Sequence, residues 1–585
     1  MLTEGPNSDR HARLSPDGNL IAFLSDRDRA SDFQLFFLDT RTQRLTAGPR
    51  PHGWIEYFEW SPDGRRILLG VAAHGADLSS GQGATGTDTF PSNEPSWMPQ
   101  VIGPSPDNAW RRIWIVDVET SEARCVSGDA LAVWEASWCG DDSLTAIASP
   151  EPDEGAWYAA ALSLIDVTTG MATPVYTPTH QLAVPRGSPS GRFVAFVEAV
   201  ASDRGYVAGD LRLYDRRDRS LTSLETSGMD VTSIAWTGED ELLAAGYRGL
   251  CTVVATVRVG GGPGRTLWEE SGISTSGSHP VVLGLDRPDT FVFVREGFFD
   301  RPGIATVVDG IAKIAPTADP APPWGDIGQA EAVRWQAPDG LTIEGWLLRP
   351  GGEPPYPTVM DVHGGPIVHW RPYWLGRAPH VLMLLRHGYA IFMPNPRGSS
   401  GRGQDFAGRV VGDIGGADTA DFLSGIDHLI TAGIADPCRL GVMGLSYGGL
   451  MTCWLTTQDR RFGAALSVGP ATNHVSHHLT CNIPQFVRLF VQDHYTDLTG
   501  RYYSRSPLLH AHHSRTPTLL VAGDLDRCTP ASEALQFHNA LVENGVESWV
   551  VRYPEEGHGV HGAYASADFA ARCVMWFERH IPTRR

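Results

Sequence analysis

The sequence predicts two domains of different fold class, an N-terminal β-propeller over residues 1–325 and a C-terminal α/β domain over residues 326–585. Three observations lead to this prediction. A turn-and-strand unit repeats through the first half, strands alternate with helical patterns through the second half, and a proline- and alanine-rich tract lies between the two. A chain of 585 residues is also too long to fold around a single hydrophobic core.

The repeat in the first half combines two short patterns. One is a polar turn followed by an apolar strand, as in LSPDGNLIAFLS, and the other is an apolar strand that ends in aspartate, as in IWIVD. The turns lie at Ser15, Ser61, Cys139, Ser188, Thr237 and, more weakly, Gly284. The aspartates are Asp39, Asp117, Asp166 and Asp215, and each lies 22 residues before the next turn.

This constant spacing favours a β-propeller over a β-sandwich with chance similarity between strands. Asp117, Asp166 and Asp215 follow one another at intervals of 49 residues, a period typical of four-stranded propeller blades. The six units predict six blades. The longer interval before Asp117 contains a Gly/Ser/Pro-rich stretch from about Ala72 to Asn108, which reads as a loop insertion. A seventh blade could lie within that stretch, so we expect six or seven.

The second half alternates apolar strands with helical patterns, which is the signature of a mostly parallel sheet. The tract APTADPAPPWGD before it reads as a linker. Eight strands begin near Ala332, Leu341, Thr358, Tyr389, Arg439, Ala464, Thr518 and Ser548. We therefore expect an eight-stranded, mostly parallel sheet.

Composition and charge exclude several classes of partner. The formal net charge of -20 repels nucleic acid and anionic membranes, so we expect neither as a partner. The chain contains no apolar run long enough for a membrane span, and its first residues lack the apolar segment of a signal peptide. The eight cysteines are scattered without a CxxC pair, which predicts reduced thiols, no zinc site and a cytoplasmic location.

A candidate nucleophile lies where the fifth strand of the second half meets a helix. The residues Gly444-Leu445-Ser446-Tyr447-Gly448 form the pattern G-x-S-x-G between RLGVM and a helical pattern, which is the required setting for a nucleophile elbow of an α/β-hydrolase fold. The tight turn places the serine hydroxyl at the positive end of the following helix. We expect Ser446 to be the nucleophile.

A serine hydroxyl needs a base, and the base needs a carboxylate that orients it. In this fold the chain order is Ser, Asp, His. His558 lies in P-x-x-G-H-G after the last strand, and the loop after TLLVAG offers two acids, Asp524 and Asp526. For the oxyanion, we expect donors from the backbone N–H groups of Tyr447 and of Gly365 in the glycine loop after TVMDV.

With these residues the chain resembles the prolyl oligopeptidase family, in its acylaminoacyl-peptidase and dipeptidyl-aminopeptidase branches. The resemblance covers the whole length, with the propeller first and the hydrolase second. The matching motifs are APDGLTIEGWLLRP (337–350), VHGGP (362–366), NPRGSSGRG (395–403), GDIGGAD (412–418), GLSYGG (444–449), SRSP (504–507), DRCTP (526–530) and PEEGHG (554–559). The family pattern D-x-x-T/V-P implies that the acid is Asp526, and the resemblance implies His558 as base and a propeller that admits only short peptides.

Two departures from the family pattern bear on substrate choice. Cys528 stands where acylaminoacyl-peptidases can carry an arginine, and the propeller shows no convincing Glu-Glu pair of the kind that holds a free amine in dipeptidyl peptidases. After the nucleophile, Phe486, Leu489 and Phe490 recur at helical spacing. They either pack in the core or line an apolar pocket for the residue before the cleaved bond.

The sequence therefore predicts a serine peptidase that cleaves short peptides through an acyl-enzyme, as an acylaminoacyl-peptidase or dipeptidyl-aminopeptidase. It needs no metal and no other cofactor. A carboxylesterase or specialised amide hydrolase on the same scaffold is the alternative, because fold alone does not determine the substrate. A more remote alternative is a propeller protein that only binds its ligand and carries an inactive hydrolase domain. The sequence is also compatible with a homo-oligomer.

Overall fold

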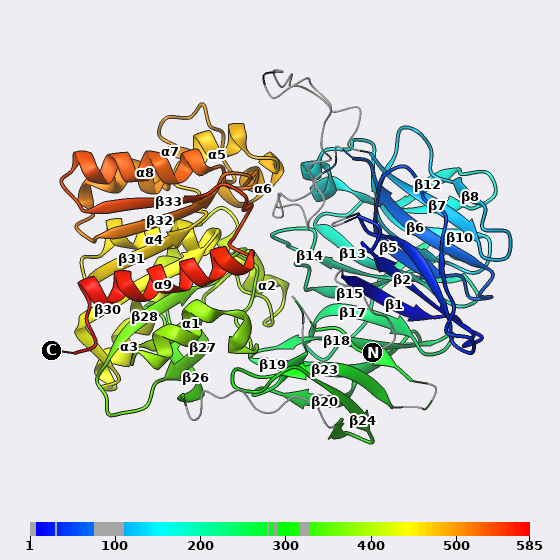
Figure 1. Ribbon diagram of the computed structural model, residues 1–585, viewed down its shortest axis with the longest axis horizontal. Coiled ribbons are helices and arrows are strands. Elements are labelled where there is room, and N and C mark those ends of the chain that lie inside the picture. Colours follow the sequence, from blue (N-terminus) through cyan, green and yellow to red (C-terminus); the bar gives the residue numbers. More distant parts are fainter. Residues whose placement is uncertain are drawn as a thin grey trace.

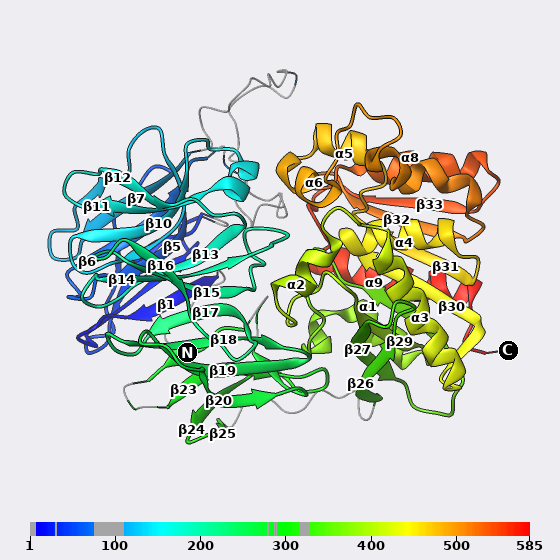
Figure 2. The same cartoon turned by 180° about the vertical axis from the view of Figure 1, so that it is seen from behind.

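A computed structural model of the chain describes residues 8–29, 32–74, 110–275, 280–285, 289–315 and 327–584, together with residues 76, 97, 277 and 287. It contains two domains that lie side by side, a propeller and an α/β domain (Figure 1). The same arrangement is seen from behind in Figure 2. The predicted fold class is confirmed for both domains.

The propeller has six blades in the described part of the chain, and each is a sheet built from consecutive strands. Blades one to three consist of β1 (Asp9–Leu14), β2 (Leu20–Ser25), β3 (Gln34–Asp39) and β4 (Leu45–Ala47); β5 (Trp54–Trp60), β6 (Arg66–Ala72), β7 (Arg111–Asp117) and β8 (Ala123–Cys125); and β9 (Ala132–Trp138), β10 (Ser143–Ser149), β11 (Ala161–Asp166) and β12 (Ala172–Tyr176). Blades four to six consist of β13 (Gln181–Gly187), β14 (Phe193–Ala199), β15 (Asp210–Asp215) and β16 (Ser220–Ser223); β17 (Asp230–Trp236), β18 (Glu241–Arg248), β19 (Cys251–Arg258) and β20 (Arg265–Glu270); and β21 (Ser274–Thr275), β22 (Leu283–Gly284), β23 (Phe291–Glu296), β24 (Gly303–Val308) and β25 (Ile311–Ile314).

The residues of the sequence repeat form the turns of the blades. In the second blade, the Ser61 hydroxyl donates to Asp63 at 2.6 Å and accepts from the Arg66 N–H at 2.9 Å, which closes the turn between β5 and β6. The aspartate that ends a third strand accepts from the turn that follows, as Asp117 does from the Thr120 N–H at 2.8 Å. The spacing of 22 residues therefore corresponds to the path from the third strand of one blade to the first turn of the next.

The α/β domain is built on one sheet of eight strands in the order β26-β27-β29-β28-β30-β31-β32-β33. The strands are β26 (Gln329–Gln336), β27 (Thr342–Arg349), β28 (Tyr356–Val362), β29 (Ala390–Asn395), β30 (Ala435–Leu445), β31 (Phe462–Val468), β32 (Thr518–Gly523) and β33 (Ser548–Tyr553). The first two pair antiparallel with their neighbours and the rest are parallel.

Helices cover both faces of this sheet. They are α1 (Pro379–Arg386), α2 (Gln404–Ala407), α3 (Ala417–Thr431), α4 (Tyr447–Gln458), α5 (His474–Thr480), α6 (Pro484–Val491), α7 (Arg501–Ser504), α8 (Ala531–Glu543) and α9 (Ala563–His580). Short 3-10 turns are η2 (Leu375–Arg377), η3 (Gly408–Val410) and η4 (Pro507–His513), and η1 (Glu154–Ala159) belongs to the propeller. Helices α1 and α9 share one apolar layer with the sheet, and α3 and α4 share the layer on the other face.

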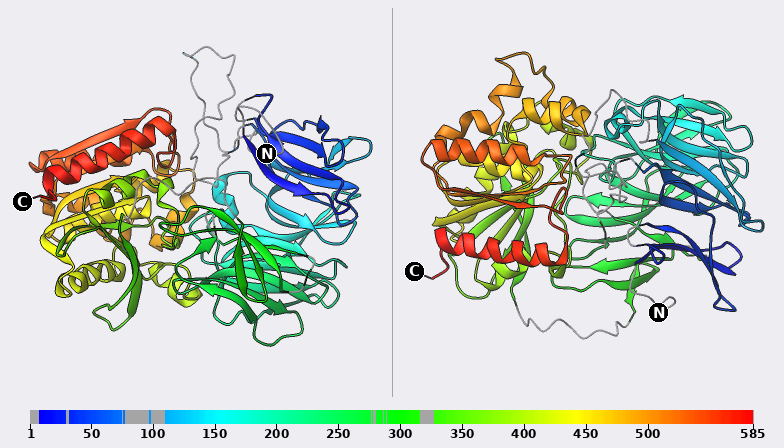
Figure 3. Two further views of the ribbon diagram at one scale, coloured as in Figure 1. Left: turned by 60° about the horizontal axis from the view of Figure 1, so that its bottom comes forward. Right: turned by 45° about the horizontal axis from the view of Figure 1, so that its top comes forward.

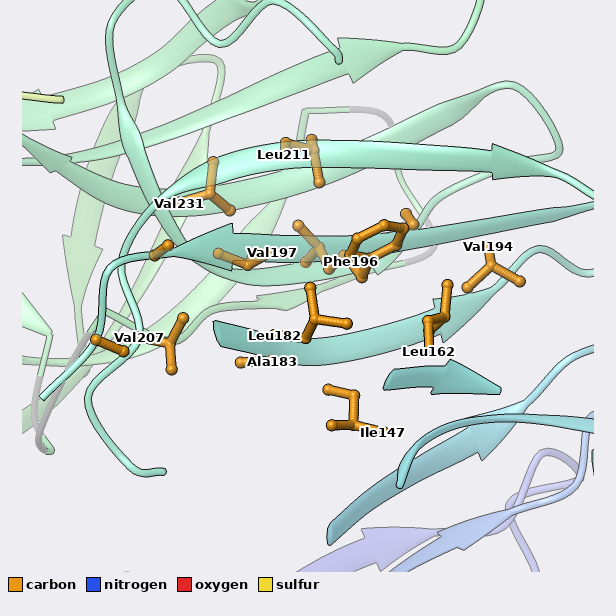
Figure 4. Packing of buried hydrophobic residues seen from close by; sticks show 14 of the residues in the cluster. Ile147, Leu162, Leu182, Ala183, Val194, Phe196, Val197, Val207, Leu211 and Val231 are labelled. Carbon is orange, nitrogen blue, oxygen red and sulfur yellow. The ribbon is translucent and has the colours of Figure 1, made fainter. Parts of the chain in front are cut away.

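The two domains also share apolar packing. A cluster of buried side chains from blades three to five, part of which is drawn in Figure 4, includes Phe196, Leu182 and Val231. Ile483 and Cys528 of the α/β domain belong to the same cluster. The helix α6 and the loop of Cys528 are therefore held against the propeller, at the junction that Figure 3 shows from two further directions.

Two sequence predictions fall on residues outside the described ranges. Strand β25 ends at Ile314 and β26 begins at Gln329, so the domain boundary placed between residues 325 and 326 lies at the edge of the undescribed segment 316–326. The proposed insertion from about Ala72 to Asn108 also lies almost entirely outside them. No helix in the described part of the chain is long and apolar enough to cross a membrane.

Candidate active site

Ser446 lies at a strained turn between β30 and α4. Its backbone has φ 63° and ψ -119°, a conformation that a residue with a side chain rarely adopts. A Cβ atom at Gly448 would lie 2.0 Å from the Val362 carbonyl oxygen, and one at Gly444 would lie 2.6 Å from the Gly448 backbone. Both glycines of the G-x-S-x-G pattern are therefore required, because the turn leaves no space for side chains.

Asp526 and His558 form the acid and base of the site. The Asp526 Oδ2 atom lies 2.8 Å from His558 Nδ1, and both side chains are almost fully buried. The other candidate acid, Asp524, instead accepts from Arg552 at 2.7 Å at the surface. His558 Nε2 has no hydrogen-bond partner among the described residues, and His558 lines one cavity with Ser446. This nitrogen is the one that can take the hydroxyl proton.

The two expected oxyanion donors lie on either side of Ser446. Gly365 and Tyr447 line one cavity with the nucleophile, and in the described part of the chain neither backbone N–H has an acceptor. Gly365 has a φ of 111°, and a Cβ atom there would lie 2.5 Å from the Ile367 nitrogen. The positions are those of an oxyanion hole.

Two of the motifs that match the family pattern contribute residues next to this oxyanion site. The Tyr447 hydroxyl donates to the buried Asp418 at 2.7 Å, and burial raises the pKa of Asp418 to about 6. His363 Nε2 and the Ser399 hydroxyl lie 2.9 Å apart. The motifs GDIGGAD and NPRGSSGRG thus supply Asp418 and Ser399, which contact the side chains of Tyr447 and His363.

An apolar pocket opens next to Ser446 on the side of helix α6. Phe486 and Phe490, for which the sequence left core packing and pocket lining open, line it together with Ile483, Val487 and Val491. Leu489 was expected there and does not line it. Leu489 packs, as Phe486 also does, against apolar clusters of both domains.

Two histidines in the same pocket were not singled out by the sequence. His474 and His477 of α5 line it, and burial lowers the pKa of His474 to about 3 and that of His477 to about 4, so both rings are neutral. Cys528 also lines it and is buried against the propeller. The position where related peptidases can carry an arginine therefore adds no charge.

A second and larger cavity lies on the other side of Ser446. Its volume is about 530 Å³, against about 30 Å³ for the apolar pocket. It reaches His558, His561 and the loop before α1, and Asp361 of β28 lies in its wall. The sequence offered no sign of Asp361 as a site residue, because it reads as one position of a buried strand.

The propeller completes both cavities through one loop between β14 and β15. Ser202 lines the apolar pocket and Tyr206 lines the larger cavity. The Ser202 hydroxyl accepts from the Ile367 N–H at 2.8 Å, next to the oxyanion loop, and the Tyr158 hydroxyl donates to the Ser202 carbonyl. No motif marks this loop, so the sequence alone could not place it in the site.

Buried ion pairs hold this loop and η1 in position. Arg204 pairs with Glu154 at 3.0 Å, and Arg111 pairs with Glu154 at 3.3 Å and with Glu56 at 3.0 Å. The acidic partners raise the pKa of Arg204 despite its burial. Glu154 is thus paired with two arginines, and its carboxylate is already neutralised where η1 approaches the site.

Comparisons with known proteins agree with this geometry. Residues 377–583 match the sequence model of the Prolyl oligopeptidase family. "Uncharacterized peptidase YuxL" of Bacillus subtilis is 35% identical over 261 residues, 43% of this chain and 39% of that one. The acylamino-acid-releasing enzyme of Arabidopsis thaliana is 33% identical over 233 residues, 38% of this chain and 30% of that one. The matches thus span well under half of these relatives.

Solved structures extend the likeness to the whole chain, at the level of fold. Pyrococcus horikoshii acylaminoacyl peptidase superposes with a TM-score of 0.76 at 21% identity, over 99% of this chain and 89% of that one. An acylaminoacyl peptidase in complex with Z-Gly-Gly-Phe-chloromethyl ketone gives 0.75 at 20% identity, with 99% and 89% covered. Residues 377–583, the segment of the α/β domain that carries Ser446, Asp526 and His558, therefore match the prolyl oligopeptidase family.

Proposed function

We propose that this chain is a serine peptidase that cleaves short peptides through an acyl-enzyme, as an exopeptidase of acylaminoacyl-peptidase or dipeptidyl-aminopeptidase type. One observation carries the proposal. The buried Asp526–His558 pair, with a contact of 2.8 Å, presents an unpartnered Nε2 to a cavity that Ser446 also lines. The names of the relatives, acylamino-acid-releasing enzymes and a dipeptidyl-peptidase, support the same class.

The reaction follows from the positions of these groups. The Ser446 hydroxyl attacks the peptide carbonyl carbon while His558 Nε2 takes its proton, and the N–H groups of Tyr447 and Gly365 stabilise the oxyanion. The C–N bond then breaks as His558 returns the proton to the leaving amine. Water attacks the remaining ester by the same steps in reverse and frees Ser446 and an acid product.

The apolar pocket of Phe486 and Phe490 is proposed to take the side chain before the cleaved bond. Short peptides are the proposed substrates, and no nucleic acid or membrane is involved. A cytoplasmic location is also proposed. It is supported by the eight cysteines, all described by the structure and all free thiols.

Paired peptides test the proposal. One carries an N-acetyl group and the other a free amine, with Phe or Ala before the cleaved bond, and mass spectrometry identifies the products. We expect cleavage by the wild type and a loss of several orders of magnitude in Ser446→Ala with unchanged thermal unfolding. A fluorophosphonate probe should label Ser446 alone. Full activity of Ser446→Ala would contradict the assignment.

A further inference from the structure

One buried acidic group in the wall of the larger cavity takes no part in the catalytic steps above. Asp361 lies on β28 and is 5% exposed, and its carboxyl makes no hydrogen bond or ion pair with any described residue. Side chains alternate along a strand, so Asp361 shares the face of Val359, which packs in the apolar layer beneath α1 and α9. The carboxyl therefore lies in an apolar layer, at the wall of the 530 Å³ cavity that Ser446 also lines.

An isolated carboxyl in such a place is costly. Burial alone raises the pKa of Asp361 to about 8, with no hydrogen bond to oppose it. The carboxyl also raises the pKa of the neighbouring Tyr373 and Cys573, whose own burial is the larger cause. A cation beside a buried carboxylate offsets part of the cost of its lost hydration, whereas a carboxylate left without a partner bears that cost in full.

The cavity lies on the side from which the leaving group departs. His558, which returns the proton to the leaving amine, lines this cavity and does not line the apolar pocket. Asp361 is paired in register with Met443, three residues before Ser446. At about 3.3 Å per residue this separation is roughly 10 Å, a distance that favours a long side chain on the residue after the cleaved bond.

The rest of the cavity suits the stem of such a side chain. Met443, Leu466, Val468 and Phe569 supply apolar walls between Ser446 and Asp361. A lysine or arginine stem can lie along apolar surface while its charged end meets an acid.

Three other titratable groups in the wall of the cavity, Arg377, His380 and His363, do not oppose a cation. Arg377 is already paired with Glu296 of the propeller. His380 and His363 are neutral, since burial lowers the pKa of each to about 4. Asp361 is therefore the acidic group there that has neither an ion pair nor a hydrogen bond within the described residues.

We propose that this cavity is the subsite for the residue after the cleaved bond, and that it takes a lysine or arginine side chain with Asp361 as the counter-ion. The proposal rests on the proposed peptidase function and names its substrate class, peptides with a basic residue at the leaving side. The contact forms one charge-assisted pair at a carboxyl that is itself 5% exposed, and charge-assisted pairs are stronger than neutral hydrogen bonds.

Matched substrates test this selectivity in the wild type, so no variant needs to fold. They share the acyl part and carry lysine, norleucine or glutamate after the cleaved bond, since norleucine keeps the stem of lysine without its charge. We expect kcat/KM for lysine to exceed that for norleucine at least tenfold, with glutamate poorest. The preference should disappear in Asp361→Asn and persist in Asp524→Asn, whose acid is paired with Arg552 at the surface. Equal rates for lysine and norleucine would overturn the proposal.

A measurement of peptide binding tests the cation subsite independently of the proposed peptidase function. In Ser446→Ala, calorimetry compares the tripeptides Lys-Ala-Ala and norleucine-Ala-Ala, which correspond to leaving products. We expect binding of the lysine peptide to be at least tenfold tighter, and equal binding after Asp361→Asn is added. If no peptide is cleaved by the wild type but this difference is found, the peptidase proposal fails while the cation subsite stands. If cleavage occurs without the difference, Asp361 is a structural carboxyl only.

Discussion

Asp526 shows how backbone amides prepare a carboxylate for catalysis. The N–H groups of Cys528 and Thr529 donate to one oxygen at 2.8 Å, and the Thr529 hydroxyl donates to the other at 2.8 Å. The second oxygen also meets His558 Nδ1. These donors satisfy the buried charge and keep the carboxylate in one orientation, so that it holds the His558 ring through Nδ1 and leaves Nε2 without a hydrogen-bond partner among the described residues.

We predict that Asp526→Asn lowers kcat by roughly 10⁴, because an amide cannot hold His558 in the tautomer that accepts the serine proton. Asp524→Asn should stay within about twofold of the wild type. Steady-state kinetics on one acylated peptide substrate measures both, with circular dichroism as the check of folding. A severe loss in Asp524→Asn, or near-normal turnover in Asp526→Asn, would show that the acid had been misassigned.

At the scale of elements, loops rather than strands join the two domains around the site. Asp230 at the start of β17 accepts from the N–H groups of Gly401 and Gly403 at 2.6 and 3.1 Å, and Gln404 at the start of α2 accepts from the Val200 N–H at 2.9 Å. The residues 397–403 thus lie against blade five, and they also carry Ser399, which contacts His363 of the oxyanion loop. The docking of the propeller and the position of the oxyanion site are linked through this one loop.

Asp230 makes this docking sensitive to pH. Burial raises the pKa of Asp230 to about 6, from an ordinary value of about 3.9. The folded protein therefore binds this proton more tightly than the unfolded chain. The stability that the proton contributes is fully present below about pH 4 and is lost as the pH rises through 6, an effect of roughly 3 kcal/mol for two pKa units.

We predict that Asp230→Asn removes this dependence, because the amide oxygen can still accept from the loop and carries no charge. As the pH rises from 4 to 7, the Tm of the variant should increase relative to the Tm of the wild type. Asp218→Asn, at a propeller surface position with a side chain 60% exposed, is the matched control and should show no such shift. If the difference in Tm between Asp230→Asn and the wild type stays the same from pH 4 to pH 7, Asp230 does not titrate in this pH range.

At the scale of the whole molecule, the site belongs to both domains. Ser446 shares one cavity with Ser202 and the other with Tyr206, and both of these residues come from the propeller. The apolar cluster of blades three to five continues into Ile483 and Cys528 of the hydrolase. A substrate that reaches Ser446 must therefore fit between the two domains.

We predict size selection as the consequence. Peptides of a few residues should be cleaved, whereas denatured casein should yield no internal fragments over the same time. Mass spectrometry of the digest checks this, with a short acylated peptide in the same tube as the internal control. Rapid conversion of casein to internal fragments would contradict a propeller that restricts access.

The sequence by itself determined the features that depend on near neighbours along the chain. The spacing of 22 residues predicted the propeller blades, and the alternation of strands and helices predicted the mostly parallel sheet. Gly444 and Gly448 around Ser446 marked the elbow because their need for small side chains is local. The same holds for Asp526, whose loop donors lie two and three residues away.

Only the tertiary structure decided which residues meet across the two domains. Ser202 accepts from Ile367, 165 residues further along the chain, and no motif records that contact. Phe486 and Phe490 line the apolar pocket and Leu489 does not, although the three residues share the same helical spacing. Asp361 reads as one residue of a buried strand, and its isolation arises because α1 and α9 form an apolar layer with the sheet on its side. Burial and charge depend on what packs against a residue, and packing between distant segments leaves no periodicity in the sequence.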